Sequence, residues 1–258
     1  MNITEEMLKK YSAGFNGDRA NRAVRDAVMT CGLNKSCLNH DARRNTTHSF
    51  SLTLEQGSVT NQKASGRCWL FAAMNVMRVR IIKKLNLKDF ELSQNYMLFW
   101  DKLEKANWFF ENILDTTEEP TGSRLLDFLL RDPVGDGGQW DMMANLVKKY
   151  GVVPKGAMPE SAVSSATREM DRLLTELLRT DAVTLRKMAA EGKDRQALEA
   201  EKERMLGDVS RILVICLGEP PRTVDLEVGD KDNNFISDRG LTPQELFKKY
   251  VDMTFPTT

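Results

Sequence analysis

The sequence has little cysteine, little histidine and no long apolar run. Its 258 residues include four cysteines and two histidines, and no Cys-x-x-Cys pair occurs. This rules out a disulfide framework, and no run approaches the roughly 18 apolar residues of a membrane span. The start, MNITEEMLKKYSAGF, is charged and lacks the apolar core of a signal peptide. We therefore expect a reduced, cytoplasmic, soluble protein.

The sequence also lacks net charge. Lys plus Arg and Asp plus Glu number 37 each, so no global field favours nucleic acid or an anionic membrane. Hydrophobic residues make up 41% and charged residues 29% of the chain, which is typical of a soluble globular protein. A chain of this length can bury one large core or two modest ones.

The first 60 residues are expected to form a separate N-terminal segment. Helical spacing is present near residues 5–10 and 18–29. SFSLTLEQ (49–56) alternates apolar and polar residues, which is typical of a half-buried strand. Residues 1–60 are therefore predicted to contain short helices and one strand.

Residues 61–160 carry the clearest helical patterns. An almost continuous apolar run follows Cys68 and ends in basic residues before Leu85, which suits the negative end of a helix dipole. Its first two turns have almost no polar residues, so this helix is expected to be buried all round. Ser93 is predicted to be the N-cap of a second helix that reaches Leu114.

Two further segments complete the chain. Residues 161–218 show two amphipathic stripes and are predicted to form a helical hairpin, either a subdomain or an insertion. Residues 219–258 are expected to begin the following strand and helix region, with a strand at 223–228. Thr242, followed by Pro and then Glu245, predicts a capping box at a helix start.

The stretch NQKASGRCWLFAAMNVMR places Cys68 where a polar segment meets the apolar helix. A thiol attacks only as a thiolate, and the free N–H groups and dipole of a helix N-terminus favour an anion. An isolated cysteine before an apolar helix is more often an inert core residue. The position of Cys68 alone leaves both interpretations open.

Several blocks in order across about residues 50 to 250 resemble one family. They are EQGSVTNQKASGRCWLFAAMNVMR, ELSQNYMLFWDKLEKANWF, DGGQWDMM, KKYGVVPK and LGEPP. The blocks are similar to those of the bleomycin hydrolase and aminopeptidase C family of papain-like cysteine peptidases. The resemblance implies an α+β papain-like fold, mainly the helical lobe plus a helical insertion, with most of the β-rich lobe absent.

The resemblance assigns roles around the cysteine. Cys68 matches the nucleophile and is followed by Trp69, which we expect beside the substrate. Gln62, six residues earlier, matches the donor that holds the oxyanion together with the backbone N–H of Cys68. A primary amide is a neutral donor that suits such a hole.

The motif GDGGQW (135–140) is interpreted through the same resemblance. Gly137 and Gly138 match a glycine pair whose backbone lines the cleft and pairs with the substrate main chain, and glycine leaves room for that approach. Asp136 is expected near the substrate amine. A tight turn before a helix is the alternative interpretation of this motif.

One departure from secreted papain-like enzymes concerns a disulfide. Those enzymes usually carry a cysteine three residues before the nucleophile, bridged to one just ahead of the glycine pair. Ser65 and Gly135 stand in these places. The joint absence agrees with a reducing compartment.

The catalytic base is not found by sequence. In the superfamily a histidine and its orienting asparagine come long after the cysteine, from the β-rich half, whereas no histidine follows Cys68. His40 and His48 precede it and are interpreted as surface or structural residues. General acid–base catalysis contributes about 10² to 10⁴-fold, so this chain alone is expected to show little or no turnover. An expressed fragment, a split gene and a natural short form remain open explanations.

The resemblance implies hydrolysis of N-terminal peptide or amide bonds through a thioester acyl-enzyme. Peptides are the expected substrates, and homohexamers the expected assembly. Neither a metal nor an organic cofactor is implied, and nucleic acid is an unlikely partner. The alternative is a catalytically inactive binding or assembly module that retains the cleft.

Overall fold

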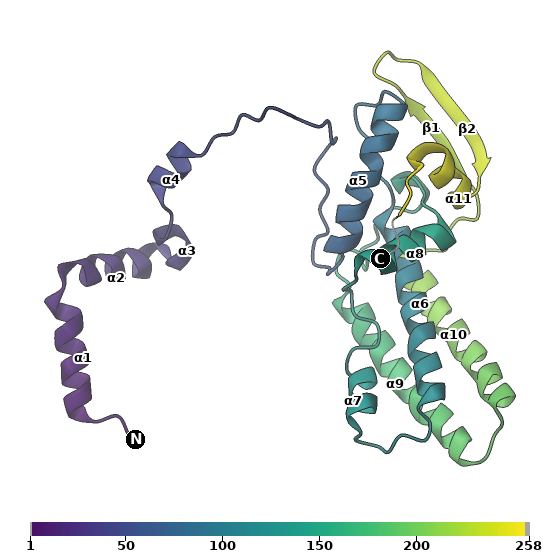
Figure 1. The fold of residues 1–258 in the computed structure, drawn as a ribbon, viewed down its shortest axis with the longest axis horizontal. Coiled ribbons are helices and arrows are strands. Elements are labelled where there is room, and N and C mark those ends of the chain that lie inside the picture. Colours follow the sequence, from purple (N-terminus) through teal and green to yellow (C-terminus); the bar gives the residue numbers. More distant parts are fainter. Residues whose placement is uncertain (1, 256–258) are drawn as a thin grey trace. The chain divides into compact units, whose positions relative to one another are not determined.

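The computed structural model describes residues 2–255 and divides into two compact units, Met1–Leu54 and Glu55–Thr258. The first unit contains only short helices among its described residues: α1 Glu5–Gly17, α2 Arg19–Cys31, α3 Leu33–Ser36 and α4 His40–Asn45 (Figure 1). Three of them begin at side-chain caps, in which Thr4, Asp18 and Asn39 accept a hydrogen bond from a backbone N–H. None of these helices has a buried residue.

The strand predicted at residues 49–56 is wrong, because this stretch has no regular secondary structure. Its apolar residues Phe50, Leu52 and Leu54 are 75%, 76% and 59% exposed. A strand is stable only when a neighbouring strand satisfies its backbone groups and a face is buried. No such neighbour lies beside this stretch among the described residues, so the alternation alone could not produce a strand.

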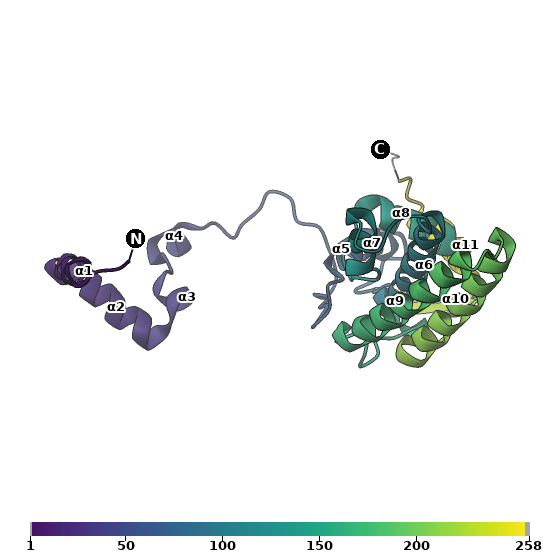
Figure 2. The same cartoon turned by 90° about the horizontal axis from the view of Figure 1, so that it is seen from below.

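The second unit is mostly helical. Its elements before the sheet are α5 Cys68–Lys84, α6 Gln94–Asp115, α7 Arg124–Arg131, α8 Trp140–Tyr150, the 3₁₀ turn η1 Lys155–Ala157, α9 Arg168–Ala190 and α10 Arg195–Leu217. Ser93 caps α6 as predicted, since its hydroxyl accepts from the Tyr96 N–H. The predicted hairpin of α9 and α10 is also confirmed, and it runs beside α6 in both ribbon views (Figure 1, Figure 2).

Helix α6 is the centre of the core. It packs against α5, α7, α8, α9 and α10, and its Phe109, Phe110 and Leu98 side chains are wholly buried. Residues of the hairpin, including Leu174 and Leu213, belong to the same apolar cluster as those of α5 and α8. The hairpin therefore shares the main core.

Helix α5 is not buried all round, contrary to the prediction from its composition. One side carries the buried residues, while Cys68, Ala72 and Val76 are exposed along the other. These three positions are four residues apart, so they lie on one stripe of the helix. The physical reason is that small or apolar residues can face outward when nothing in the described unit packs on them.

The small sheet has two antiparallel strands, β1 Val224–Gly229 and β2 Phe235–Leu241. The strand predicted at 223–228 is thus confirmed, whereas β2 was not predicted. The sheet is followed by α11 Pro243–Leu246, whose predicted capping box is present, and by one π-helical turn, η2 Phe247–Val251.

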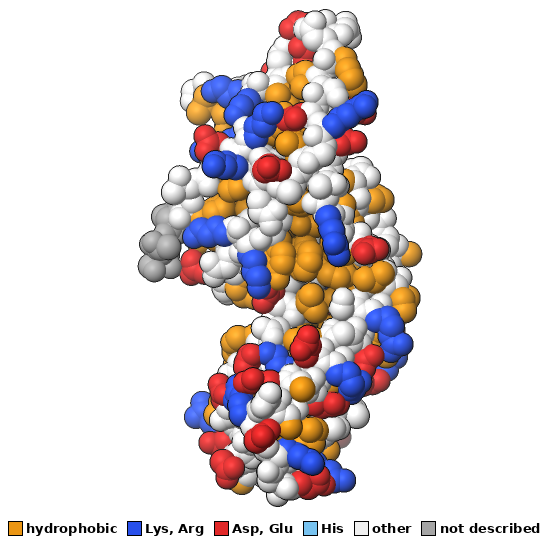
Figure 3. Space-filling model, turned by 90° about the vertical axis from the view of Figure 1, so that its right-hand side faces the viewer, with side chains coloured by type: hydrophobic (Ala, Val, Ile, Leu, Met, Phe, Trp, Pro, Cys, Tyr) orange, Lys and Arg blue, Asp and Glu red, His pale blue; other side chains and the backbone are white. Residues whose placement is uncertain are grey.

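The surface of the second unit mixes charges of both signs. In Figure 3 lysine and arginine side chains lie among aspartate and glutamate side chains, and apolar side chains gather across the middle of the face. No large single-sign patch is visible on that face. Within residues 2–255, no helix is both long and apolar enough to cross a membrane.

Candidate active site

Cys68 is the first residue of α5, and its side chain is exposed. The preceding residue, Arg67, is the N-cap, and its side chain makes no capping hydrogen bond. The backbone N–H of Cys68 has no hydrogen-bond partner among the described residues. The sulfur therefore lies at a helix end with unsatisfied donors, where an anion is favoured. The predicted placement on a helix end is confirmed.

The turn that contains Gln62 is fixed to the rest of the unit. Gln62 is half-buried, and its carbonyl accepts from the Ser65 hydroxyl at 2.7 Å. The Ala64 N–H donates to the Ser165 carbonyl at 3.0 Å, just before α9. These bonds hold in place the turn formed by the five residues between Gln62 and Cys68.

Arg67 turns its side chain into the protein. Its guanidinium is wholly buried and meets Glu160 through two hydrogen bonds, Nη1–Oε1 at 3.0 Å and Nη2–Oε2 at 2.8 Å. Its Nε donates to the Ser65 hydroxyl at 2.9 Å, and the Phe71 ring lies 5.1 Å away. A paired guanidinium of this kind fixes the start of α5 rather than contacting the sulfur.

The carboxylate of Asp136 is enclosed by donors. Its Oδ2 accepts from the Gly66 N–H at 2.6 Å and from the Thr167 hydroxyl at 2.6 Å, while Oδ1 lies 2.8 Å from Lys102 Nζ. Burial alone would raise the pKa of Asp136, but Lys102 and these hydrogen bonds hold it well below its usual range. The expected contact of Asp136 with a substrate amine stays a prediction.

Lys102 is a wholly buried cation on α6. Besides Asp136, its Nζ contacts the Val134 carbonyl and Asp171 Oδ1, each at 2.6 Å. Two acceptors, the Val134 carbonyl and Asp136, thus take hydrogen bonds from the ammonium, and the Asp171 carboxylate adds an ion pair. Burial is the main reason that the pKa of Asp171 rises to about 6, and this shift is opposed by Lys102.

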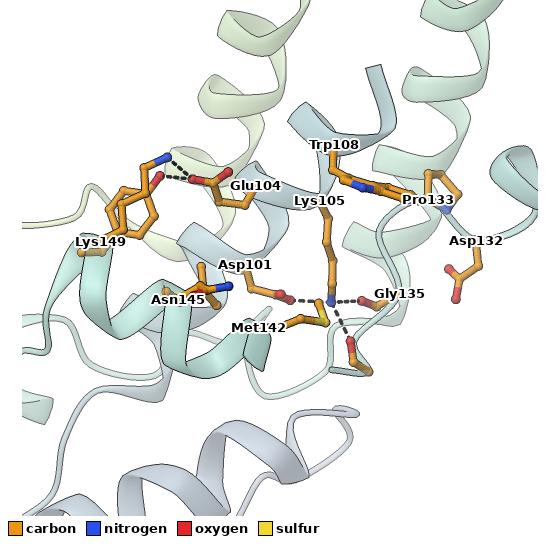
Figure 4. Close-up of a pocket in the computed structure, with 13 residues that line it drawn as sticks. Asp101, Glu104, Lys105, Trp108, Asp132, Pro133, Gly135, Met142, Asn145 and Lys149 are labelled. Carbon is orange, nitrogen blue, oxygen red and sulfur yellow. Dashed lines mark hydrogen bonds and ion pairs between the residues drawn. The ribbon is translucent and has the colours of Figure 1, made fainter. Parts of the chain in front are cut away.

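Lys105, one turn further along α6, reaches the glycine motif with its ammonium group (Figure 4). Its Nζ donates to the Gly135 carbonyl at 2.6 Å, to the Gly137 carbonyl at 2.8 Å and to Asp101 Oδ2 at 2.7 Å. Burial raises the pKa of Asp101 to about 6 and lowers that of Lys105. The pair therefore anchors the loop within the protein.

The two glycines of the predicted pair have different surroundings. A Cβ on Gly138 would lie 2.4 Å from the Trp69 ring, whereas a Cβ on Gly137 would meet nothing within 4 Å. Trp69 is half-buried, and its Nε1 donates to the Asp136 carbonyl at 2.7 Å. Glycine at 138 is thus required by close packing on Trp69. The carbonyls of residues 134–137 all accept bonds from within the protein.

A cavity of about 670 Å³ adjoins this loop. It lies between one face of α6 and one face of α8, and residues 132–137 close it on a third side. Figure 4 shows Trp108 and Pro133 at one end and Glu104 with Lys149 at the other. Its size is that of a small-molecule or side-chain site.

Sequence reasoning missed the charged groups that support the site. Lys102 was overlooked because lysine is usually exposed, although a signal was present. Leu98, Lys102 and Ala106 are spaced by four, so Lys102 occupies a core position of α6. Among residues 2–255, no group of three or more His, Cys, Asp or Glu side chains could hold a metal ion.

Comparison with known proteins places the chain. Residues 2–258 match the model of the Peptidase C1-like family. The chain belongs to the Peptidase C1-like family. Aminopeptidase C of Listeria innocua is 46% identical over 251 residues, and human bleomycin hydrolase is 41% identical over 257 residues. These alignments cover 97% and 98% of this chain and 56% of each relative.

A solved Peptidase C1-like structure agrees in fold. The crystal structure of PepW from Lactobacillus rhamnosis HN001 superposes with a TM-score of 0.93 at 48% identity. It covers 98% of this chain and 57% of that one. The chain therefore spans a little more than half the length of the relatives it matches, and the described region is the mainly helical part of a Peptidase C1-like fold with a small two-stranded sheet.

Proposed function

We propose that Cys68 is the nucleophile of a cysteine aminopeptidase that cleaves N-terminal peptide or amide bonds. The observation that carries the proposal is the exposed Cys68 sulfur on an uncapped helix end, preceded by the fixed turn that holds Gln62. Family membership and relatives named aminopeptidase C and bleomycin hydrolase support it.

The proposed chemistry follows from these groups. The Cys68 thiolate attacks the scissile carbonyl carbon, and the carbonyl oxygen takes the negative charge. The free N–H of Cys68 and the side-chain amide of Gln62 stabilise that oxyanion. The tetrahedral intermediate then expels the amine, which gains a proton, and leaves a thioester. Water hydrolyses the thioester, releasing the acid and restoring the thiol.

The amine proton requires a general acid. No histidine follows Cys68 in the sequence. We propose that a histidine and an asparagine from a β-rich half of the family fold supply this step. Without them, loss of the acid–base function costs about 10² to 10⁴-fold or more, so this chain alone should turn over poorly.

The rest of the proposal rests on the family. Peptides with a free N-terminus are the proposed substrates, hexamers of identical subunits the proposed assembly, and the cytoplasm the proposed location. Gly137 and Gly138 are proposed to line the path of the substrate main chain, with the Trp69 ring packed against Gly138.

Alkylation tests the nucleophile directly. Iodoacetamide is added between pH 5 and pH 8, and labelling at each cysteine is followed by mass spectrometry. Cys31 and Cys37 are matched controls because they are exposed as Cys68 is. We expect Cys68 to react at least about tenfold faster than either control below pH 7, because only its thiolate lies at the start of a long helix. Equal rates would contradict the proposal.

A fluorogenic aminoacyl amide tests turnover. Little release is expected from this chain, and none from Cys68→Ala. Rapid release that Cys68→Ala abolishes would show that the chain supplies its own general acid.

The second candidate is a non-catalytic binding or assembly module. The absence of any histidine after Cys68 favours it for the isolated chain. Slow, equal alkylation of Cys68 and the control cysteines, together with peptide binding in calorimetry, would support the module.

A further inference from the structure

We infer that Asp136 is a positioning residue for Cys68. Its carboxylate ties the turn before α5 to the glycine motif, and Lys102 holds the carboxylate in place. This inference rests on the proposed role of Cys68 as the nucleophile. It gives Asp136 an internal role, and the predicted contact of Asp136 with a substrate amine stays a prediction.

The tie is the hydrogen bond between the Gly66 N–H and the Asp136 carboxylate, which joins residues far apart in the sequence. Gly66, two residues before Cys68, donates its N–H to Asp136 Oδ2 at 2.6 Å across 70 residues. Thr167 donates to the same oxygen from the segment that leads into α9. Three separate parts of the chain therefore converge on one carboxylate.

The buried cation Lys102 determines which oxygen of Asp136 binds which donor. Lys102 Nζ donates hydrogen bonds to Asp136 Oδ1 and to the Val134 carbonyl, and it forms an ion pair with Asp171 Oδ1. The ammonium fixes Oδ1, so Oδ2 is left for Gly66 and Thr167. Charge-assisted bonds of this kind are shorter and stronger than neutral ones. An asparagine has only one acceptor oxygen and could not serve both sides.

The consequence concerns the geometry of attack. Gly66 lies between Gln62 and Cys68, so the hydrogen bond to Asp136 restrains the backbone of the turn that joins the proposed oxyanion donor to the helix end that carries the sulfur. Displacements of about 1 Å at such a site can cost about 100-fold in rate. Asp136 acts through this positioning, without touching the reacting atoms.

The test compares two carboxylates that share Lys102. Asp136→Asn removes the charge that binds Gly66, whereas Asp171→Asn removes an equal charge that does not. Hydrogen exchange of the Gly66 amide, measured by NMR, reports the tie itself. We expect about tenfold faster exchange in Asp136→Asn and no change in Asp171→Asn. Only the former substitution removes the charged group that accepts the hydrogen bond from the Gly66 N–H.

The second readout is the iodoacetamide rate of Cys68 relative to Cys31. It should fall several-fold in Asp136→Asn and stay near wild type in Asp171→Asn. Unchanged Gly66 exchange in Asp136→Asn would overturn the tie. Faster exchange with an unchanged Cys68 rate, or an equal loss in Asp171→Asn, would overturn the positioning role.

The outcomes separate the two proposals. If wild-type Cys68 reacts no faster than Cys31, the nucleophile proposal fails while the Gly66 measurement still reports the tie. If Asp136→Asn does not fold, the wild-type protein remains informative. Exchange of its Gly66 amide at the rate of an unstructured peptide would overturn the inference.

Discussion

Arg67 and Glu160 lie 93 residues apart in the sequence and form a bidentate ion pair. Arg67 immediately precedes the helix that begins at Cys68. The guanidinium is wholly buried, and the Glu160 side chain is 21% exposed. The helix end that carries the sulfur therefore depends on a buried charge. Removing one partner of such a pair is far more costly than removing a surface ion pair.

The first prediction concerns this pair. Arg67→Met should lower the free energy of unfolding by about 3 kcal/mol, because it leaves Glu160 without its cation. Urea denaturation followed by circular dichroism measures the change. Arg172→Met is the control, since Arg172 pairs with Glu169 and Glu176 on the exposed face of α9. The control should keep the wild-type midpoint, and equal losses in both variants would contradict the argument.

The second prediction concerns pH and Asp181 of α9. Burial raises the pKa of Asp181 to about 6, opposed by Arg204 and assisted by Asp208 and Glu201. Because the folded pKa exceeds the unfolded value near 3.9, the stability from this group is present below about pH 4. It is lost as the pH rises from about 4 through about 6.

Asp181→Asn should remove the loss of folding stability that Asp181 causes as the pH rises. Among the described residues, Oδ2 of Asp181 has no hydrogen-bond partner, so a neutral amide is easier to bury. The variant should be more stable than wild type at pH 7, by about 1 kcal/mol after allowing for solvent access. The two should be equal at pH 4. Thermal unfolding of the wild type and of Asp181→Asn between pH 4 and pH 7 measures this difference in stability.

The third prediction uses the glycine pair. Gly138→Ala places a methyl 2.4 Å from the Trp69 ring, and the ring is held by its bond to the Asp136 carbonyl. Crowding of this kind costs about 1–3 kcal/mol. Gly137→Ala adds a methyl in open space and should change the unfolding midpoint little. Similar losses from both substitutions would show that Trp69 is not the constraint.

The fourth prediction concerns the irregular stretch around residues 46–56. Phe50, Leu52 and Leu54 are exposed and lie outside any helix or strand, so chymotrypsin should cut there first. Mass spectrometry should find an early, resistant product that begins between residues 51 and 55. First cleavage within α6 or α10 would contradict the division of the chain into two compact units near residue 54.

Much of the helical architecture could be predicted from local signals. Ser93 and Thr242 were identified as caps from their residue type and spacing, because such caps depend on only a few neighbouring residues. Cys68 was placed at a helix start for the same reason. These features need no knowledge of distant contacts.

The remainder depended on distant parts of the chain. The alternation at 49–56 predicts a strand only if another strand pairs with it, and none does among the described residues. The charged pairs of Arg67 and Lys102 join segments separated by tens of residues. A lysine or arginine is normally solvated, so its partner cannot be identified from local sequence.

The contact between Gly66 and Asp136 also has a redox consequence. A nucleophilic thiol must stay reduced to act, and reductants that protect Cys68 can open a strained or exposed disulfide beside it. A tie made of a carboxylate, an ammonium and a backbone N–H transfers no electrons. The loops that carry the sulfur and the glycines can thus stay joined at any glutathione level that keeps the thiol free.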